Sequence, residues 1–286
     1  MPSSMDLAAR LSAIVALQQE ILSAVSDPAA LTSLIVTQIP EICGGSGAII
    51  ELLDGADLVF QAASGTAAQH IGRRLAVSAS LAGLCVRENQ LIRSDDVEMD
   101  PRVDIGAARE IGIRSMIIAP LTRQGGAFGA LLVFSSRPNS LDDLDSYCTQ
   151  LLAGITSAAL QQASAFQDQQ ASEARYRMLF EKNVAGVFRT SFSGHILDCN
   201  DAMVGFLGYA SRNDLLQQDA RDLYRDVEER ERMLSELKEK GAMTNIRLHM
   251  KKKDGSSITA LVNVTLIPAL QGEAQVLGTL VEVRSI

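Results

Sequence analysis

Hydrophobic positions near the start of the chain follow the period of an α-helix. Between residues 5 and 26, apolar side chains recur mostly at steps of three and four, with Gln and Glu between them, which predicts an amphipathic helix. These apolar residues are Leu7, Leu11, Ile14, Ile21, Leu22 and Val25. Asp27-Pro28 ends this helix and opens a second one over residues 29–39, which we expect Pro40 to terminate.

Strand patterns dominate the next hundred residues. The apolar runs 47–53 and 58–63 flank Asp54-Gly55, and the runs 115–121 and 127–135 flank Gly125-Gly126, so each pair predicts a hairpin. Between them we expect short strands and helices, at residues 75–77, 80–88, 91–94 and 107–111. This order predicts an α+β fold, with an antiparallel sheet flanked by helices.

Residues 141–181 predict one long helix, which Asn139 or Ser140 can cap. About 40 helical residues would span about 60 Å. One stripe of side chains at seven-residue spacing is Leu144, Leu151 and Ala158, and a weaker one is Cys148, Ile155 and Gln162. The helix is either core cover plus a solvated linker or a dimer-forming coiled coil. A coiled coil needs three or more clean heptads and this tract shows about two; we favour the dimer.

The last third of the chain predicts a second α+β domain, with five antiparallel strands around short helices. Ser193-Gly194 and Asp254-Gly255 mark its hairpins, and Gly208 ends a helix that begins at Asp201. One sheet face must pack on the helices, and a pocket there is plausible, although a filled core explains the same pattern. The side chains expected to line it are Phe188, Leu197, Met203, Leu207, Leu223, Leu248 and Val262.

Composition narrows the function classes. The net charge of −8, the absence of Trp and an aromatic content of 4% argue against nucleic acid as a partner. No apolar run is long enough for a membrane span, and the N-terminus lacks the features of a signal peptide. The four widely spaced cysteines fit a reducing compartment, so we expect a cytoplasmic protein.

Several segments of the first half carry a family resemblance. They include Ser80-Leu-Ala-Gly-Leu-Cys, Asp100-Pro-Arg, Ile111-Gly-Ile-Arg-Ser-Met and Gly125-Gly-Ala-Phe-Gly. Together they resemble a GAF domain over about residues 20–165. Members of this family bind many ligands or none, so the resemblance implies a fold and leaves the ligand open.

The second half contains Tyr176-Arg-Met-Leu-Phe-Glu, Phe206-Leu-Gly-Tyr and Lys251-Lys-Lys-Asp-Gly-Ser, and residues 176–286 resemble a PAS domain. We therefore expect an N-terminal dimerisation helix (1–28), a GAF-like domain (29–140), a signalling helix (141–175) and a PAS-like domain (176–286). Tandem arrays of this kind usually precede a histidine kinase or a cyclic-dinucleotide enzyme. Relatives often continue from such a strand into an output helix, so a final strand that ends at Ile286 suggests a fragment cut after the sensor, with a natural short protein as the alternative.

The resemblance implies no coloured cofactor. A covalent bilin needs a Cys that is often followed by His, whereas Cys43 precedes Gly44 and Cys85 precedes Val86. The segment that would hold the flavin-adduct Cys begins at Asp214 and has none, and the helix that would carry a haem His, residues 227–240, has no His. We expect no haem, flavin or bilin.

Motifs for metals and catalysis are also missing. Asp96, Glu98 and Asp100 alternate as in a calcium loop, but Pro101 stands where the turn needs Gly, so a solvated acidic loop is expected. The histidines at 70, 195 and 249 fit no phosphoacceptor or triad pattern, and there is no phosphate-binding glycine loop. We expect no catalytic residue in this segment and no enzyme activity, although the parent protein could be a sensor kinase.

Cys85, Asp96 and Arg102 are the candidate residues of the first pocket. By resemblance, Asp96 and Arg102 flank the loop that covers it, and Cys85 lies on the helix that lines it. A buried Arg could pair with an anionic ligand, while an Asp96–Arg102 salt bridge would explain both residues without a ligand. Asn200 matches an Asn that caps the following helix, and we interpret it as structural.

The sequence thus predicts a cytoplasmic homodimeric sensor. Binding of an unidentified small molecule or a partner would shift the populations of two dimer arrangements through the 141–181 helix, toward an output domain or partner kinase. The competing hypothesis is a structural dimerisation or interaction module with no small-molecule ligand.

Overall fold

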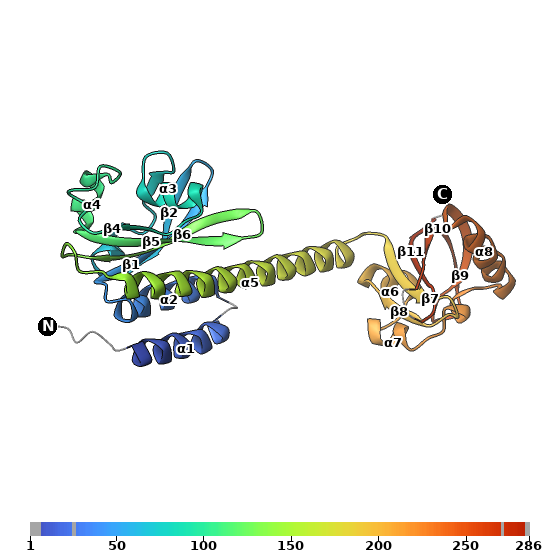
Figure 1. Ribbon diagram of the computed structural model, residues 1–286. Coiled ribbons are helices and arrows are strands. Elements are labelled where there is room, and N and C mark those ends of the chain that lie inside the picture. Colours follow the sequence, from blue (N-terminus) through green and yellow to red (C-terminus); the bar gives the residue numbers. More distant parts are fainter. Residues whose placement is uncertain (1–6, 25–26, 270–271, 284–286) are drawn as a thin grey trace. The chain divides into compact units, whose positions relative to one another are not determined.

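The computed structural model describes residues 7–24, 27–269 and 272–283, and the chain divides into two compact units, residues 1–170 and 171–286 (Figure 1). Each unit has its own sheet and its own hydrophobic core. The α+β class predicted for both halves is confirmed. None of the described helices is long and apolar enough to cross a membrane.

The first unit is built on a six-stranded antiparallel sheet in the order β3-β2-β1-β6-β5-β4. Both hairpins form at the predicted dipeptides, with Asp54 opposite Asp57 and Arg123 opposite Gly126. The strands are β1 (Gly47–Asp54), β2 (Asp57–Ala63), β3 (Arg74–Ala76), β4 (Ile92–Ser94), β5 (Ser115–Arg123) and β6 (Gly126–Ser135).

Helices cover both faces of this sheet (Figure 1). One face packs on α1 (Leu7–Ala24), α2 (Pro28–Ile42) and the first half of α5 (Asp143–Glu181). The other face packs on η1 (Gly65–His70), α3 (Leu81–Glu88) and α4 (Ile105–Ile111). Because side chains alternate along a strand, Ile50 of β1 faces the first set and Ile49 faces the second.

The prediction that Pro40 ends the second helix is wrong, because α2 continues to Ile42. Proline has no N–H to donate to the carbonyl four residues earlier, which is that of Val36. The Ser64 hydroxyl donates a hydrogen bond to this carbonyl instead. This tertiary contact allows a proline inside the helix. At the start of the helix, the Asp27 carboxylate accepts hydrogen bonds from the N–H groups of Ala29 and Ala30 and serves as the cap.

Helix α1 confirms the predicted N-terminal helix, but its apolar positions divide into two stripes. Ile14 and Ile21 are buried in the unit, whereas Leu7 and Leu11 are exposed. The side chain of Leu22 and the whole of Val25 lie outside the described part of the chain. Arg10 is also buried and makes an ion pair of 2.6 Å with Asp145 of α5, so this helix is fixed to the core by charge as well as by packing.

The start of α5 differs from the prediction that Asn139 or Ser140 caps it. The helix begins at Asp143, and Asp142 and Asp145 exchange hydrogen bonds, each carboxylate accepting from the other's backbone N–H at 2.9 and 2.8 Å. This reciprocal arrangement is a capping box with Asp in place of Glu. Cys148 is buried and Ile155 packs on the core, whereas Leu151 and Ala158 point outward.

The second unit is a five-stranded antiparallel sheet in the order β8-β7-β11-β10-β9, as expected for residues 176–286. The strands are β7 (Gly186–Ser191), β8 (Ile196–Cys199), β9 (Ala242–Lys251), β10 (Ser257–Ile267) and β11 (Gln275–Glu282). The helices are α6 (Asp201–Leu207), α7 (Arg212–Leu216), η2 (Ala220–Leu223) and α8 (Val227–Lys240). The sheet and these helices enclose one core. The strand predicted to end near the C-terminus is present, and Ile286 lies outside the described residues.

Candidate ligand-binding site

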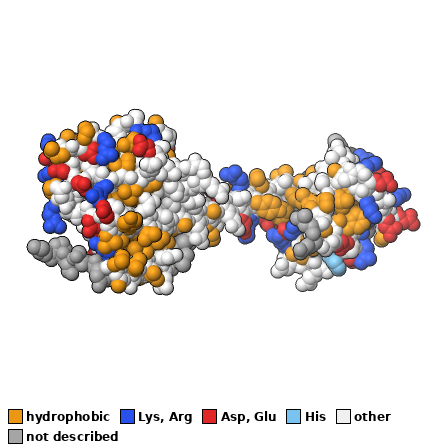
Figure 2. Space-filling view, viewed as in Figure 1, with side chains coloured by type: hydrophobic (Ala, Val, Ile, Leu, Met, Phe, Trp, Pro, Cys, Tyr) orange, Lys and Arg blue, Asp and Glu red, His pale blue; other side chains and the backbone are white. Residues whose placement is uncertain are grey.

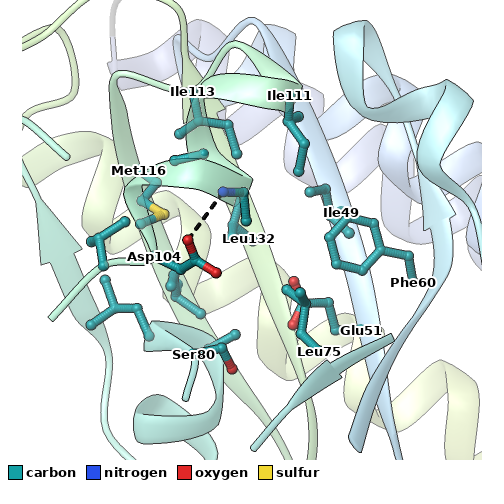
Figure 3. Close-up of a pocket in the computed structure, with 16 residues that line it drawn as sticks. Ile49, Glu51, Phe60, Leu75, Ser80, Asp104, Ile111, Ile113, Met116 and Leu132 are labelled. Carbon is teal, nitrogen blue, oxygen red and sulfur yellow. Dashed lines mark hydrogen bonds between the residues drawn. The ribbon is translucent and has the colours of Figure 1, made fainter. Parts of the chain in front are cut away.

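A cavity lies in the first unit between the sheet and the helices α3 and α4 (Figure 3). About 60 Å³ of it is open to the centres of water molecules, which is space for roughly four to six waters. Its walls come from β1, β2, β3, β5 and β6 and from the two helices. The residues that line it are Ile49, Glu51, Phe60, Leu75, Ser80, Leu81, Ala82, Val103, Asp104, Ala107, Ala108, Ile111, Ile113, Met116, Ile118 and Leu132.

Two polar side chains of the lining serve as helix caps. The Ser80 hydroxyl accepts from the Gly83 N–H at 3.0 Å, and the Asp104 carboxylate accepts from the N–H groups of Gly106 and Ala107 at 3.0 and 3.2 Å. Asp104 is exposed and Ser80 half-buried, so both stand where the cavity meets solvent. Gly83 allows α3 to approach the preceding loop, since a Cβ there would lie 2.0 Å from the Val77 carbonyl oxygen.

Glu51 is the polar group at the inner wall of the cavity. It follows Ile50 at a bulge in β1 and turns to the same side of the sheet as Ile49, where Figure 3 places it beside Leu75 and Phe60. The residue is 1% exposed, and its Oε2 atom has no hydrogen-bond partner. Burial raises the pKa of this carboxyl to about 8, because removal from water penalises the charged form.

The described lining contains no Lys, Arg or His, so the charge of an ionised Glu51 is not compensated. Cys85 of α3 lies nearby but outside the lining, with its Sγ donating to the Ile118 carbonyl at 3.6 Å. Burial, and then the charge of Glu51, raise the pKa of this thiol to about 12. A neutral buried thiol of this kind is an inert packing group.

Asp96 and Arg102, the other two sequence candidates, also lie outside the cavity lining. The Asp96–Arg102 salt bridge, the alternative to a ligand at these residues, does not form. Asp96 pairs with Arg114 at 3.1 Å, and Arg102 pairs with Asp100 at 2.7 Å. Arg102 holds the pKa of Asp100 at about 2, and its side chain is 48% exposed. A guanidinium in solvent with its own carboxylate partner gives no support for the anionic ligand considered above.

The acidic loop is bound by arginines. Glu98 pairs with Arg109 at 3.3 Å, in addition to the pairs of Asp96 and Asp100 just described. Across the described ranges, no group of His, Cys, Asp and Glu is arranged to hold a metal ion.

The pocket candidates of the second unit form part of its packed core. Phe188, Met203, Leu207, Leu223, Leu248 and Val262 are all buried there. Phe188 lies over Gly278, where an added Cβ would approach the ring to 2.3 Å. Leu197 is wrong as a pocket residue, because it is 41% exposed. Strand alternation turns its neighbour Ile196 inward instead.

Asn200 is fully buried and joins three elements of the second unit. Its side-chain oxygen accepts from the N–H groups of Val187 and Met203 at 2.9 and 3.0 Å. Its amide nitrogen donates to the carbonyls of Phe180 and Ala185, both at 2.9 Å. The predicted role as the cap of α6 is confirmed, and the same side chain also fixes the end of α5 against β7.

Sequence reasoning missed Glu51. The sequence does contain a signal for it, an acidic residue between Ile50 and Leu52 in the apolar run 47–53. A single acid in a strand is usually on a solvated face. Only the helices packed on this face of β1 show that Glu51 is buried.

Comparison with known proteins follows the division into two units. The model of a family described as GAF domain matches residues 25–161, and that of a family described as PAS domain matches residues 184–285. No curated protein sequence matches the chain.

Solved structures similar to the chain include a GAF domain from an Acinetobacter phosphoenolpyruvate-protein phosphotransferase. It is 20% identical with a TM-score of 0.50, over 57% of this chain and 99% of that one, and supports the fold of the first unit. A domain of a Geobacter sulfurreducens sensory box sensor histidine kinase/response regulator is 24% identical, over 39% and 95% of the two chains, with a TM-score of 0.34. A PAS domain of an HTR-like protein from Haloarcula marismortui is 20% identical, over 42% and 98%, with a TM-score of 0.34.

Proposed function

Since the chain carries a GAF domain followed by a PAS domain, two sensory domains typical of signal-sensing modules, we propose that it senses a small molecule in the GAF cavity and passes the bound state on through α5 as a homodimer. The observation that carries this proposal is α5 itself. It is a single helix of 39 residues whose first half packs in the GAF core and whose last turn is held by Asn200 in the PAS domain.

The outer surface of α5 supports a dimer. Tyr147 and Leu151 are 71% and 54% exposed, and the small residues Gly154, Ala158 and Ala165 continue the same heptad stripe on the exposed side. Leu7, Leu11 and Val15 of α1 are exposed on a helix that pairs with α5 through Arg10 and Asp145. Figure 2 shows hydrophobic side chains gathered over this part of the GAF domain. Small residues let two helices approach closely, so a second copy of the chain fits this surface.

The later part of α5 also favours a partner helix. Residues 164–179 are exposed, and they include Phe166 at 41% and Leu179 at 68%. A helix exposed all round gains little from tertiary packing, and isolated helices of this length are marginal in water. Pairing in a dimer would stabilise it and connect the two ends mechanically.

The output domain is a further part of the proposal. The family resemblance favours a histidine kinase that reads the arrangement of the two α5 helices. If no small molecule binds, the same dimer would be a structural dimerisation or interaction module, which is the competing hypothesis. The packed PAS core is compatible with both the sensor and this module.

The first test is the oligomeric state of the full chain by light scattering after size exclusion. We expect a dimer. The change Leu151→Glu should weaken this dimer by at least about tenfold, because it places a charge in the proposed contact between the two α5 helices. Ile71→Glu is the matched control, because Ile71 is an exposed apolar residue directly after η1, on the other face of the sheet, and this change should leave the dimer unchanged. A monomeric wild-type chain would exclude the dimeric mechanism.

Hydrogen exchange on the same variants tests transmission through α5. If dimer pairing stabilises the exposed half of the helix, amides of residues 164–179 should exchange at least about tenfold faster in Leu151→Glu. Equal exchange in the monomeric variant and the dimer would show that the helix does not depend on pairing. Signal transfer by a change of pairing would then be excluded.

A further inference from the structure

One polar atom of the described cavity lining, Oε2 of Glu51, has no hydrogen-bond partner, so the cavity lacks a hydrogen-bond donor. Glu51 Oε2 is buried with no hydrogen bond, while the other polar side chains of the lining, Ser80 and Asp104, are occupied as helix caps. A buried carboxyl without a donor is less stable than one with a donor by a few kcal/mol. A ligand that donates to Oε2 would remove this penalty.

The charge of the lining favours a cation. Its only ionisable side chains are the carboxyls of Glu51 and Asp104, and no basic group is present among the described lining residues. The Phe60 ring beside Glu51 offers a further favourable surface for a positive charge. An anion would meet two carboxyls and no compensating group.

The size and apolar walls limit the rest of the ligand. Space for roughly four to six waters admits about as many non-hydrogen atoms. Apart from the three polar residues, the walls are Ile, Leu, Val, Ala, Met and Phe side chains. The matching group is a compact alkyl chain of a few carbons.

We propose that the GAF cavity binds a small alkylammonium group, with its nitrogen donating to Glu51 and its alkyl part against Ile49, Phe60 and Leu132. This inference rests on the proposed sensory function and specifies the class of ligand. Binding is an ion pair with a charge-assisted hydrogen bond, and no covalent step is involved.

Binding is coupled to proton release. The ligand pairs with ionised Glu51, whose pKa is raised to about 8 by burial, so binding at neutral pH displaces the carboxyl proton to solvent. The affinity should rise by up to about tenfold per pH unit below 8 and level off above it. Of the other groups around the site, Asp104 is exposed at the mouth, and burial raises the pKa of Cys85 to about 12, so the thiol stays neutral in this range.

The test uses three branched probes of similar size: isobutylamine, isobutanol and isobutyrate. Each is titrated into the full chain labelled at isoleucine methyl groups, because Ile49, Ile111, Ile113 and Ile118 line the cavity and report its occupancy by NMR. We expect isobutylamine to shift these methyl signals at millimolar concentration and isobutyrate to leave them unchanged. The amine affinity should increase between pH 6 and pH 8.

Two matched variants complete the design. Glu51→Gln keeps the shape of the side chain and removes its charge, so it should weaken isobutylamine by at least about tenfold and leave isobutanol unchanged. Asp104→Asn removes a charge at the mouth while Asn still caps α4, so it should change amine affinity less than about twofold. The unshifted methyl signals of each free variant verify its fold.

The outcomes separate this inference from the proposed function. If isobutanol or isobutyrate occupies the cavity as tightly as the amine, or if Glu51→Gln retains the amine, the cationic ligand is excluded and a small-molecule sensor remains. If no probe shifts the lining methyl groups, the inference is also overturned, and the GAF domain would act without a ligand of this size. The dimer and exchange experiments on α5 remain independent of both results.

Discussion

Among the polar side chains that the two domains bury, Asn200 and Glu51 differ most clearly in what surrounds them. Asn200 in the PAS domain is 0% exposed and forms hydrogen bonds with four backbone groups within 3.0 Å. Glu51 in the GAF domain is 1% exposed, and its Oε2 has none. The side chain of Asn200 holds three segments of the PAS domain together, whereas Glu51 leaves a hydrogen-bond acceptor free beside a cavity, which is the atom that the proposed ligand would contact.

The packing around the two residues agrees with this difference. In the PAS core, Phe188 fills the space above Gly278, with no room for one further carbon atom. In the GAF core, about 60 Å³ beside Glu51 stays open to water centres. The first unit thus has open space beside its buried carboxyl, whereas the second unit is closely packed at Gly278.

The largest effect is expected for Glu51→Gln at high pH. The pKa of Glu51 is about 8 in the fold against 4.5 for a free side chain. Below pH 4.5 the carboxyl is neutral in both the folded and the unfolded chain, so the free energy of unfolding has its full value. As the pH rises through 8, the unfolded chain is favoured because it ionises this carboxyl more readily, and that stability is lost. Gln stays neutral, so above pH 8 the variant should be more stable than the wild type by roughly 3–5 kcal/mol, and equal to it near pH 4.

The measurement is urea unfolding followed by hydrogen exchange in peptides from residues 47–135, at pH 4 and pH 8.5. Peptides from residues 186–283 serve as an internal control and should show no difference. A stability difference independent of pH would mean that Glu51 titrates normally and that its surroundings are wetter than described.

Replacing Asn200 tests the other side of the comparison. Asn200→Ala leaves two buried N–H groups and two carbonyls without their partner, so it should destabilise the PAS domain by roughly 3–4 kcal/mol at any pH. Asn213→Ala, on the exposed side of α7, is the control and should stay within about 0.5 kcal/mol. Urea unfolding by circular dichroism measures both, and a loss below about 1 kcal/mol for Asn200→Ala would contradict its structural role.

A methyl group added at Gly278 should show that the PAS core is full. Gly278→Ala forces Phe188 to move and should destabilise the domain by roughly 1–3 kcal/mol. Combining it with Phe188→Leu should give less than the sum of the two single losses, because the smaller side chain makes room. If the losses of stability in the two single variants simply add in the double variant, contact with the Phe188 ring is not the reason that residue 278 must be glycine.

The smallest effect is expected at Leu197. Because it lies on the outer side of β8, Leu197→Ala should change stability by less than about 1 kcal/mol, whereas Ile196→Ala should cost about 2–4 kcal/mol. Thermal unfolding of the two variants compares adjacent residues of one strand. A larger loss at Leu197 would place it in an interface outside the described contacts.

The elements of the fold were largely predictable, because their signals are local. Hairpin dipeptides such as Asp54-Gly55, the glycine after α6 and the cap at Asn200 act through neighbouring residues, and each took its predicted role. Local rules failed where a distant residue supplied a partner. Pro40 was expected to end α2, but Ser64 satisfies the carbonyl that the proline leaves free. A pair of Asp96 with Arg102 was the local alternative to a ligand, but the fold brings Arg114 to Asp96 instead.

Taken alone, the sequence determined the class of the two domains, the order of their elements and the long helix between them, because side-chain periodicity and turn chemistry depend on residues close in the chain. The tertiary structure decided the site. Whether Glu51 faces solvent or a cavity depends on the strands and helices that cover it, and residues 80–132, far along the chain, supply most of them. Burial and charge compensation are set by such distant neighbours, and the pattern along one strand does not contain them.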